Sequence, residues 1–480
     1  MTAARQISQA ATQDASREDG AGWDPLIRPL NPTTLAPLPE IQPTTADELD
    51  AVASSAAAGL RTWAADPRRR SRVMRDWAEA LRADAGELSA DLVAETGKPI
   101  TEARAEVAAA ADALEYNAGL TRIHLGTAGS LPDGSVSHVV REPVGPSLFL
   151  VPWNWPVLLL LRDIAPALAA GVTCIVKPSP QTSHVTTRVL RLGRRAGLPE
   201  EVVQVVYGDV AVAQHLLHDP RMRAVAFTGS TKVGEAVLRS TADRMLRPLL
   251  ELGGKNAAVV LPDADLDSAL PTLARAAVIT AGQMCMACSR LLVHRSVHRE
   301  AVGAVRDTLR AMRLGDPAKD ATEIGPLVSP AHAASVMGHI DGVRGQAGVS
   351  GGELVHPDGI AGHAVTPAVV DDPDRDAAII HTDVFGPVLT IEPFDNEEDA
   401  VTRANVTRYG LVAAVWTGDP GRALRVAARL EAGTVWVNGW NTSYPDAPGG
   451  GMKSSGLGRV RGIHGVAQFT ETKHIHLPVG

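Results

Sequence analysis

Cysteine is scarce in this sequence, with only three in 480 residues. Cys174, Cys285 and Cys288 match neither a disulfide framework nor a zinc pattern, and no histidine cluster lies near the last two to complete a metal site. We therefore predict no bound metal. In a reducing compartment, a free cysteine is either core filler or a nucleophile.

Long apolar runs and tracts of one charge are also missing. No stretch of about 18 uninterrupted apolar residues occurs, which argues against a membrane-spanning helix. The N-terminus lacks an apolar run with a cleavage site, which argues against secretion. The net charge of −8 argues against a nucleic-acid partner. We expect a cytoplasmic protein that binds neither membranes nor nucleic acids.

What is present is an ordinary globular composition, with 45% hydrophobic and 21% charged residues. The chain is too long for one core, and a size of roughly 150 residues per domain suggests about three units. Residues 1–22 have no apolar period and are expected to form a flexible tail.

Helical patterns dominate the next part of the chain. Thr44 to Glu48 has the form of a capping box, and the Ala-rich run continues as a helix to Trp63. Apolar residues at three- and four-residue spacing predict two more helices, at 70–96 and 100–120.

From about residue 137, short apolar strands alternate with helices. The first group of expected strands is 147–151, 173–177, 202–206 and 223–227, with helices at 157–170 and 185–196. A second group follows, with strands at 257–261, 290–293, 387–393, 411–417 and 434–438 and helices at 266–281, 298–312, 397–405 and 421–430. This alternation predicts βαβ units, parallel sheets and two α/β domains, with a boundary near Gly253 and Gly254. Residues 468–477 alternate like a strand with no obvious hairpin partner.

Three motifs carry polar groups suited to chemistry. Asn154 lies between two Trp and two Pro after an apolar strand, which suits either an oxyanion donor or a rigid turn. The segment 227–234 joins a strand to a helix through Gly229 and Ser230, which is a weak signal for phosphate binding. Glu251 ends another apolar strand, where it is either ion-paired or a desolvated base.

A fourth motif surrounds Cys285, in the run Ala-Gly-Gln-Met-Cys-Met-Ala-Cys at 281–288. The thiol follows a mostly apolar helical pattern and has apolar neighbours, so we expect it in a sheltered place.

Together these motifs resemble the NAD(P)-dependent aldehyde dehydrogenase superfamily from about residue 28 to the C-terminus. The matching segments are 152–156 (PWNWP), 177–179 (KPS), 227–230 (FTGS), 251–255 (ELGGK), 282–285 (GQMC), 385–387 (FGP) and 450–456 (GGMKSSG). Their order and spacing make the resemblance specific.

The resemblance implies an α/β fold of the aldehyde-dehydrogenase type. It divides the chain into a Rossmann-type cofactor domain (23–122 and 142–252), an α/β catalytic domain (253–452) and small β segments for oligomerisation (123–141 and 453–480). Members pair through such segments, so a homodimer or homotetramer is expected.

The resemblance also implies catalytic roles. Cys285 attacks the aldehyde to form a thiohemiacetal, and hydride loss leaves a thioester. Asn154, with the Cys285 backbone N–H, holds the oxyanion. Glu251 activates the water that releases the carboxylic acid. Cys288 is expected to be packing, with a redox partner of Cys285 as the alternative.

The implied cofactor is NAD or NADP. Lys177 is expected at the adenosine ribose, Ser230 at the pyrophosphate and Phe385 near the nicotinamide. The full set of implied cofactor residues is Trp153, Lys177, Ser179, Pro180, Gly229, Ser230, Val233, Leu252, Asp383 and Phe385.

Two of these positions depart from the family pattern. Pro180 replaces the Glu that accepts from the ribose 2′-hydroxyl in NAD-preferring members, so NADP use becomes plausible. Asp383 replaces a Glu that grips the nicotinamide ribose, and its side chain is one methylene shorter. The change at Pro180 leaves the choice between NAD and NADP open, and the change at Asp383 affects the expected geometry of hydride transfer.

The implied substrate is a small-molecule aldehyde. Gly449 stands where a Phe is common, which predicts a wider pocket and a bulky apolar or aromatic aldehyde. Arg162 offers the alternative of an ω-carboxy semialdehyde resembling succinate semialdehyde, although Ile279 replaces a second Arg found in such members. The other expected substrate residues are Trp155, Met284, Met286 and Trp440.

Two rival functions remain. A CoA-acylating aldehyde dehydrogenase fits less well because Glu251 is retained as a water activator. A catalytically silent binding protein of this fold is suggested by Pro180, Asp383 and Asp163, the last standing where many members have Lys. The presence of all three central groups argues against silence.

Overall fold

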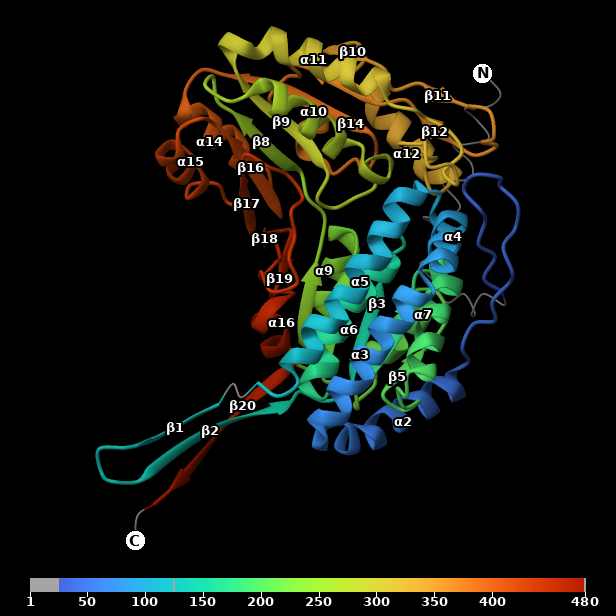
Figure 1. Ribbon diagram of the computed structural model, residues 1–480, viewed down its shortest axis with the longest axis vertical. Coiled ribbons are helices and arrows are strands. Elements are labelled where there is room, and N and C mark those ends of the chain that lie inside the picture. Colours follow the sequence, from blue (N-terminus) through green and yellow to red (C-terminus); the bar gives the residue numbers. More distant parts are fainter. Residues whose placement is uncertain (1–25, 124–125, 479–480) are drawn as a thin grey trace.

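The computed structural model describes residues 26–123 and 126–478. Figure 1 shows two α/β lobes and a β arm that projects from the lower lobe. The expected flexible tail, residues 1–22, lies outside the described residues.

The lower lobe is built on a six-stranded sheet of order β19-β7-β6-β3-β4-β5. Its strands are β3 (Ser147–Val151), β4 (Cys174–Pro178), β5 (Val203–Val205), β6 (Ala224–Thr228), β7 (Arg247–Glu251) and β19 (Gly456–Leu457). All pairs are parallel except the short β19, which runs antiparallel to β7. The strands are almost continuously apolar because helices cover both faces.

One face of this sheet packs against α3 (Pro67–Ala83), α4 (Ala85–Thr96), α5 (Ile100–Leu120), α6 (Pro156–Ala170) and α7 (Ser183–Arg195). The other face packs against α2 (Ala46–Ala65), α8 (Val210–His218) and α9 (Thr231–Ala242). The predicted capping box is confirmed: the Thr45 hydroxyl accepts from the Glu48 N–H, and the Glu48 carboxylate accepts from the Thr45 N–H.

The single helix predicted over 70–96 is wrong, because the chain breaks at Asp84 between α3 and α4. Asp84 has φ −97° and ψ 9°. Its carboxylate accepts two hydrogen bonds from Arg188 on α7, at 2.6 and 3.0 Å. This tertiary contact fixes the break, which the apolar period does not reveal.

The upper lobe is built on a seven-stranded sheet of order β10-β13-β14-β9-β8-β16-β17. Its strands are β8 (Asn256–Val260), β9 (Cys288–His294), β10 (Gly348–Ser350), β13 (Ala368–Asp371), β14 (Val388–Phe394), β16 (Val412–Trp416) and β17 (Thr434–Val437). Only β10 is antiparallel to its neighbour. Helices α10 (Leu266–Ala277), α11 (His298–Ala311) and α12 (Pro330–Asp341) pack on one face, and α14 (Glu397–Asn405) and α15 (Pro420–Ala427) on the other.

The helix predicted over 266–281 is also too long. Helix α10 ends at Ala277, and a short 3-10 turn, η2 (Ile279–Gly282), follows. Within it Thr280 and Ala281 have φ of 50° and 53°, a left-handed conformation that ends the helix. The nucleophile segment is therefore separated from the helix by a strained turn.

The arm is a three-stranded antiparallel sheet of β1 (Thr127–Ser130), β2 (Val136–Pro143) and β20 (Thr470–Leu477). The C-terminal strand, which had no obvious partner in the sequence, pairs with β2 from Val136 opposite Leu477 to Pro143 opposite Thr470.

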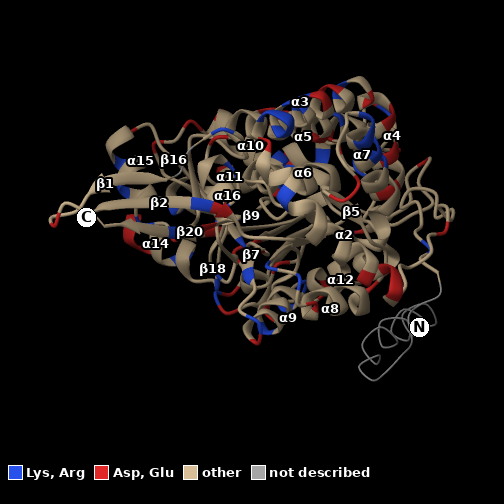
Figure 2. Ribbon diagram, turned by 90° about the horizontal axis from the view of Figure 1, so that it is seen from below, with Lys and Arg blue, Asp and Glu red and all other residues tan. Residues whose placement is uncertain are grey.

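The shorter elements are η1 (Pro180–Thr182), η3 (Arg295–Val297), α13 (Ala378–His381), α16 (Gly462–Gln468) and the strand pairs β11 (Leu354–Val355) with β12 (Ala364–Val365) and β15 (Tyr409–Gly410) with β18 (Met452–Lys453). Acidic and basic residues are interspersed along the ribbon in Figure 2. Among the described residues, no helix combines the length and apolarity needed to cross a membrane.

The strand order of the lower sheet determines where a ligand can bind. From β3 the chain winds outward through β4 and β5, then returns to the other side of β3 with β6 and β7. Ligands of open α/β sheets bind outside the carboxyl ends of the strands at such a reversal. That edge carries the segments after β3, β6 and β7, which are the predicted motifs of Asn154, Ser230 and Glu251.

Candidate active site

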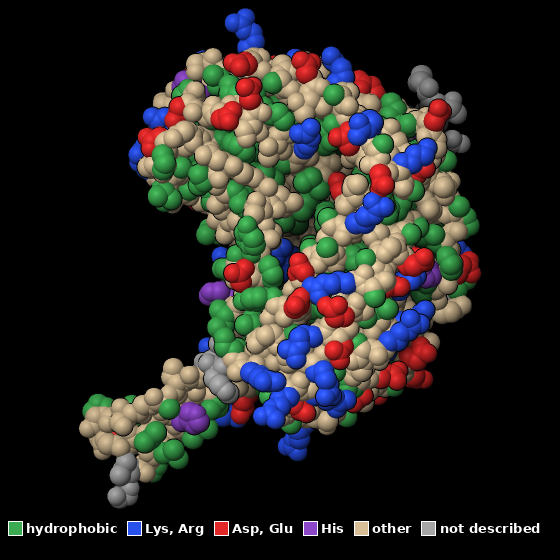
Figure 3. Space-filling model, in the orientation of Figure 1, with side chains coloured by type: hydrophobic (Ala, Val, Ile, Leu, Met, Phe, Trp, Pro, Cys, Tyr) green, Lys and Arg blue, Asp and Glu red, His purple; other side chains and the backbone are tan. Residues whose placement is uncertain are grey.

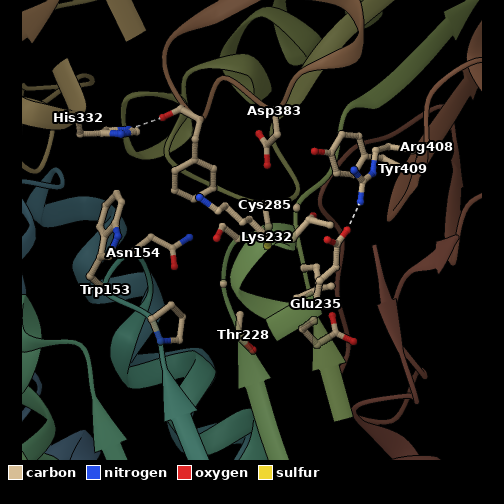
Figure 4. A pocket seen from close by; sticks show the side chains of 18 residues that line it. Trp153, Asn154, Thr228, Lys232, Glu235, Cys285, His332, Asp383, Arg408 and Tyr409 are labelled. Atoms are coloured by element: carbon tan, nitrogen blue, oxygen red, sulfur yellow. Dashed lines mark hydrogen bonds and ion pairs between the residues drawn. The ribbon is translucent and has the colours of Figure 1, made fainter. Parts of the chain in front are cut away.

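A hollow lies between the two lobes in Figure 3. A cavity of about 610 Å³ adjoins the carboxyl edge of the lower sheet. Its walls include Trp153, Asn154, Thr228, Gly229, Ser230, Glu251, Leu252, Cys285, Asp383 and Phe385. Figure 4 shows Trp153 and Asn154 on one side of Cys285, with Arg408 and Tyr409 on the opposite side.

A second, smaller cavity of about 90 Å³ lies against the same three central residues. Asn154, Glu251 and Cys285 line both cavities, so they stand where the two spaces meet. The wall of the second cavity also includes Trp155, Arg162, Met284, Met286 and Gly449, all predicted to face the substrate.

The loop that carries Cys285 is held from several elements. Glu102 on α5 accepts hydrogen bonds from the Thr280 N–H and hydroxyl, the latter at 2.7 Å. The Asn256 amide on β8 donates to the carbonyl oxygens of Cys285 and Ala287, both at 2.8 Å. These contacts stabilise the left-handed turn before the nucleophile.

Gly282 cannot carry a side chain. It has φ 75°, and a Cβ added there would lie 2.0 Å from the Gly386 carbonyl oxygen. The glycine of the GQMC motif therefore lets the nucleophile loop cross the FGP segment at close range.

Asn154 is held between the lobes. Its side chain is buried, and its Nδ2 donates to the Gln283 carbonyl oxygen at 3.0 Å. Because Gln283 is two residues before Cys285, this contact fixes the amide beside the thiol.

Burial raises the pKa of the Cys285 thiol to about 11, against the lowering effect of Arg162 and the Met286 N–H. The nearby carboxylates of Glu251 and Asp383 raise it further. At neutral pH the group is a thiol, so its attack on a carbonyl requires a proton acceptor.

Burial also raises the pKa of Glu251, to about 7, while Arg162 lowers it. Its Oε1 has no hydrogen-bond partner among the described residues. An unpaired buried carboxylate with this pKa exchanges protons near neutral pH, which suits general-base chemistry.

Arg162 is not a free cation. Its guanidinium is bound side-on to Asp163, at 2.7 and 3.0 Å, and donates to the Thr228 hydroxyl at 2.7 Å. Its Nη1 lies 4.0 Å from Glu251 Oε2. The sequence singled out Arg162 and Asp163 but did not predict these contacts.

On the other side of Cys285, aromatic rings line the larger cavity. Trp153 and Phe385 pack edge to face with ring centroids 5.7 Å apart. The Nε2–H of His332 donates to the Phe385 carbonyl oxygen at 2.8 Å. Asp383 is buried in the same wall, where burial raises its pKa to about 6 while Lys255 lowers it.

A third cavity, of about 510 Å³, shares Trp153 with the first and is lined by Ser179 and Pro180. The start of α9 borders the larger cavity, and there the Ser230 hydroxyl caps the helix by accepting from the Val233 N–H. Lys177 is buried, and its ammonium donates to the Pro178 carbonyl oxygen at 3.3 Å. The two cavities that share Trp153, the N-terminus of α9 and the buried Lys177 ammonium together fit a dinucleotide.

Three of the predicted residues do not border these spaces. The Val233 side chain is about half exposed to solvent and does not line either cavity. Lys177 is buried and does not line them either. Trp440 packs on Trp436 with ring centroids 5.2 Å apart and donates to the Met286 carbonyl at 2.9 Å. It is Trp436 that faces the smaller cavity.

Several lining residues were missed from the sequence. His332, Lys232, Arg408 and Tyr409 border the larger cavity, and Arg461 borders the smaller one. Most come from segments distant in sequence that no motif joins. Arg461 alone had a signal, since it adds a second Arg to the Gly-Arg-Val-Arg-Gly run at 458–462.

Comparisons with known proteins agree with this geometry. The family model described as the aldehyde dehydrogenase family matches residues 20–475. An NAD-dependent aldehyde dehydrogenase from Sinorhizobium meliloti is 34% identical, with a TM-score of 0.92 over 95% of this chain and 92% of that one. An aldehyde dehydrogenase from Brucella melitensis biovar abortus is 31% identical, with a TM-score of 0.91 over 95% and 94%.

An NADP-dependent enzyme from E. coli is also 31% identical, with a TM-score of 0.91 over 95% of both chains. The match to the family model spans nearly the whole chain, both lobes and every motif that meets at Cys285. The resemblance seen in the sequence is thus confirmed, and the chain belongs to the aldehyde dehydrogenase family.

Proposed function

We propose that this protein oxidises an aldehyde to the free carboxylic acid with NAD or NADP, through a covalent adduct on Cys285. The observation that carries the proposal is the position of Asn154, Glu251 and Cys285, which line both the large and the small cavity. An aldehyde in the small cavity then meets the thiol with its oxygen beside the Asn154 amide.

The chemistry follows from the groups at this junction. The Cys285 thiol gives its proton to water as its sulfur bonds to the carbonyl carbon, and the developing oxyanion accepts from Asn154 Nδ2. NAD or NADP, when bound, would supply the hydride acceptor, and loss of a hydride from the carbon of the Cys285 adduct would leave a thioester. Glu251 then takes a proton from water as the hydroxide oxygen bonds to the acyl carbon and the thiolate leaves. The three groups together favour catalysis over a silent binding protein.

The large cavity and the cavity at Pro180 are the proposed cofactor site. No carboxylate lines the wall at Pro180 except Asp209, and Arg28 lines it as well. This setting tolerates a 2′-phosphate, which supports NADP as a cofactor alongside NAD. The relatives include both an NAD-dependent and an NADP-dependent enzyme.

We propose an apolar aldehyde as the substrate. The small cavity is lined by Trp155, Leu158, Leu159, Met284, Met286 and Trp436. Its volume of about 90 Å³ is below the ~150 Å³ cavity that admits benzene. The lining thus supports the apolar part of the sequence prediction, and the volume favours a short-chain aldehyde over a bulky one.

A second candidate is an aldehyde that carries a carboxylate. Arg162 is poorly suited to bind one because Asp163 and Thr228 already hold it. Arg461 is better placed: it lines the small cavity, donates to the Ser443 hydroxyl and makes no ion pair within 4.0 Å among the described residues. Its unused donors suit an anionic group on the substrate.

One assay tests the activity. The protein is incubated with NAD or NADP and a panel of aliphatic, aromatic and carboxylated aldehydes, and reduced cofactor is followed. We expect turnover with at least one aldehyde and none in Cys285→Ala. Turnover that survives in Cys285→Ala contradicts the proposed nucleophile.

Two variants test the substrate class. Gly449→Phe adds a ring where a Cβ would lie 3.4 Å from Val460, and we expect it to raise KM for aromatic aldehydes more than for acetaldehyde. Arg461→Leu is expected to lower kcat/KM at least tenfold for carboxylated aldehydes only. An equal loss with neutral aldehydes rules out the carboxylate class, and Arg461→Lys serves as the charge-retaining control.

We also propose that the protein forms a homodimer or homotetramer through the arm of β1, β2 and β20. The arm projects from the lower lobe (Figure 1), and Ile475 and Leu477 are exposed on it. Light scattering of the intact chain and of a variant ending at residue 469 tests this, with a smaller particle expected for the truncation. Cytoplasmic location stays a prediction from the sequence.

A further inference from the structure

Arg162 and Asp163 form an unusual pair beside the proposed general base. They are consecutive on α6, where neighbouring side chains ordinarily do not face each other. Here both are only 6% exposed, and two hydrogen bonds join them: Nε to Oδ1 at 2.7 Å and Nη2 to Oδ2 at 3.0 Å. Nη2 also donates to the Thr228 hydroxyl at 2.7 Å. Two of the three guanidinium nitrogens, Nε and Nη2, therefore bond to groups other than Glu251.

The third nitrogen faces Glu251 but does not bond to it. Arg162 Nη1 lies 4.0 Å from Glu251 Oε2, which is beyond hydrogen-bond distance. Glu251 Oε1 is buried with no hydrogen-bond partner among the described residues. A movement of about 1 Å would close a charge-assisted hydrogen bond between the two groups. The contacts to Asp163 and Thr228 oppose that movement.

The charges around Glu251 make such a closure favourable without Asp163. The charged groups that act on it are Arg162 and Asp163 from α6 and Arg459 and Arg461 from the segment between β19 and α16, with Cys285 from the nucleophile loop. Three of these are cations, and Asp163 is the carboxylate among them. A carboxylate paired with an arginine has its pKa lowered by about one to three units.

We propose, on the basis of the function assigned above, that Asp163 is a positioning residue: it holds Arg162 back from Glu251 and so keeps the Glu251 carboxylate free for the hydrolytic water. The covalent step itself is unchanged. Water gives one proton to Glu251, its oxygen bonds to the acyl carbon, and the C–S bond to Cys285 breaks with the electron pair on sulfur. Arg162 contributes its charge from a distance and is not bonded to the base.

The main test is Asp163→Asn, which keeps the size of the side chain and removes its charge. We expect Arg162 to pair with Glu251. The acidic limb of the steady-state pH profile then moves down by about one unit, and kcat at about pH 8 falls about tenfold. The burst of reduced cofactor is retained, because acylation precedes the affected step. Asp163→Glu, which restores the charge, should return the limb toward the wild-type pH.

Two further variants keep the test decisive. Thr228→Val removes the hydroxyl that accepts from Arg162 and donates to Asp163 Oδ2 at 3.5 Å, and it should shift the limb in the same direction by less. Arg162→Gln removes the cation and should shift the limb upward, since Arg162 lowers the Glu251 pKa. A limb that stays in place in both Asp163→Asn and Thr228→Val overturns the proposal.

A matched control separates positioning from general damage. Glu392→Gln breaks another buried pair, in which Arg290 bonds Glu392 at 2.8 and 2.7 Å in the upper lobe. It should lower the unfolding temperature without moving the acidic limb. If Glu251→Gln leaves steady-state turnover unaffected, the proposed role of Glu251 as water activator is wrong. If Glu251→Gln slows turnover but the Asp163 variants do not shift the acidic limb, only the positioning role of Asp163 is wrong.

Discussion

The Asn154 side-chain amide and the Gln283 carbonyl oxygen are joined by a hydrogen bond of 3.0 Å. Asn154 follows β3 in the lower lobe, and Gln283 belongs to the nucleophile loop of the upper lobe. One Nδ2 proton therefore bonds across the two lobes, and the other remains available to donate to an oxyanion.

This arrangement predicts the effect of removing the amide. Asn154→Ala should lower kcat by about 10²- to 10³-fold, the range seen when one oxyanion donor is lost. KM should change little, because the ground-state carbonyl binds the donor weakly. Steady-state kinetics of purified variants checks this, with Asn154→Gln as a control for the lost lobe contact. A loss of less than about threefold contradicts the oxyanion role.

The raised pKa of Glu251 should make the free energy of unfolding depend on pH. Its pKa is about 7 in the folded protein and 4.5 in the unfolded reference, so the folded state binds the proton more tightly. The resulting stabilisation is fully present below pH 4.5 and is lost as the pH rises through about 7. Glu251→Gln stays neutral throughout.

We therefore expect Glu251→Gln to match the wild type in denaturant unfolding at about pH 4 and to exceed it above about pH 8, by up to about 3 kcal/mol. Equal stability at both pH values contradicts a buried, unpaired Glu251 in the native state. In turnover, the same variant should give a burst of reduced cofactor followed by slow hydrolysis, and unaffected steady-state turnover would refute its role as water activator.

Cys288 is predicted to be a packing residue. It is fully buried in β9, its Sγ contacts the Arg290 carbonyl oxygen, and burial raises its pKa far above the usual range. At neutral pH, iodoacetamide should modify Cys285 before Cys174 or Cys288, as mass spectrometry of the native protein can show. Cys288→Ala should lose activity under peroxide at the wild-type rate. A clearly different rate supports the redox alternative.

Pro180 predicts cofactor preference. Pro180→Glu restores a carboxylate in the cavity that Ser179 and Pro180 line. It should lower kcat/KM for NADP at least tenfold relative to NAD, because the carboxylate repels a 2′-phosphate and accepts from a 2′-hydroxyl. Pro180→Ala controls for loss of the ring. An unchanged NADP to NAD ratio in Pro180→Glu contradicts the placement of the adenosine ribose at this wall.

The sequence by itself determined much of the fold. Helix α5 and strand β3 have the predicted bounds, because their apolar periods extend over the whole element. The capping box at Thr45 is local, so it too could be predicted. The motifs of Asn154, Glu251 and Cys285 were recognisable because each depends on a short run of neighbouring residues.

Only the tertiary structure decided which side chains meet. The break at Asp84 depends on Arg188 from another helix, and the strained turn at Thr280 depends on Glu102 from α5. In the same way, the sequence offered Arg162 as a carboxylate-binding residue, and the fold binds it to Asp163 on the same helix and to Thr228 on β6. Adjacent helix residues do not ordinarily face each other, and Thr228 is distant in sequence, so local patterns do not predict these contacts.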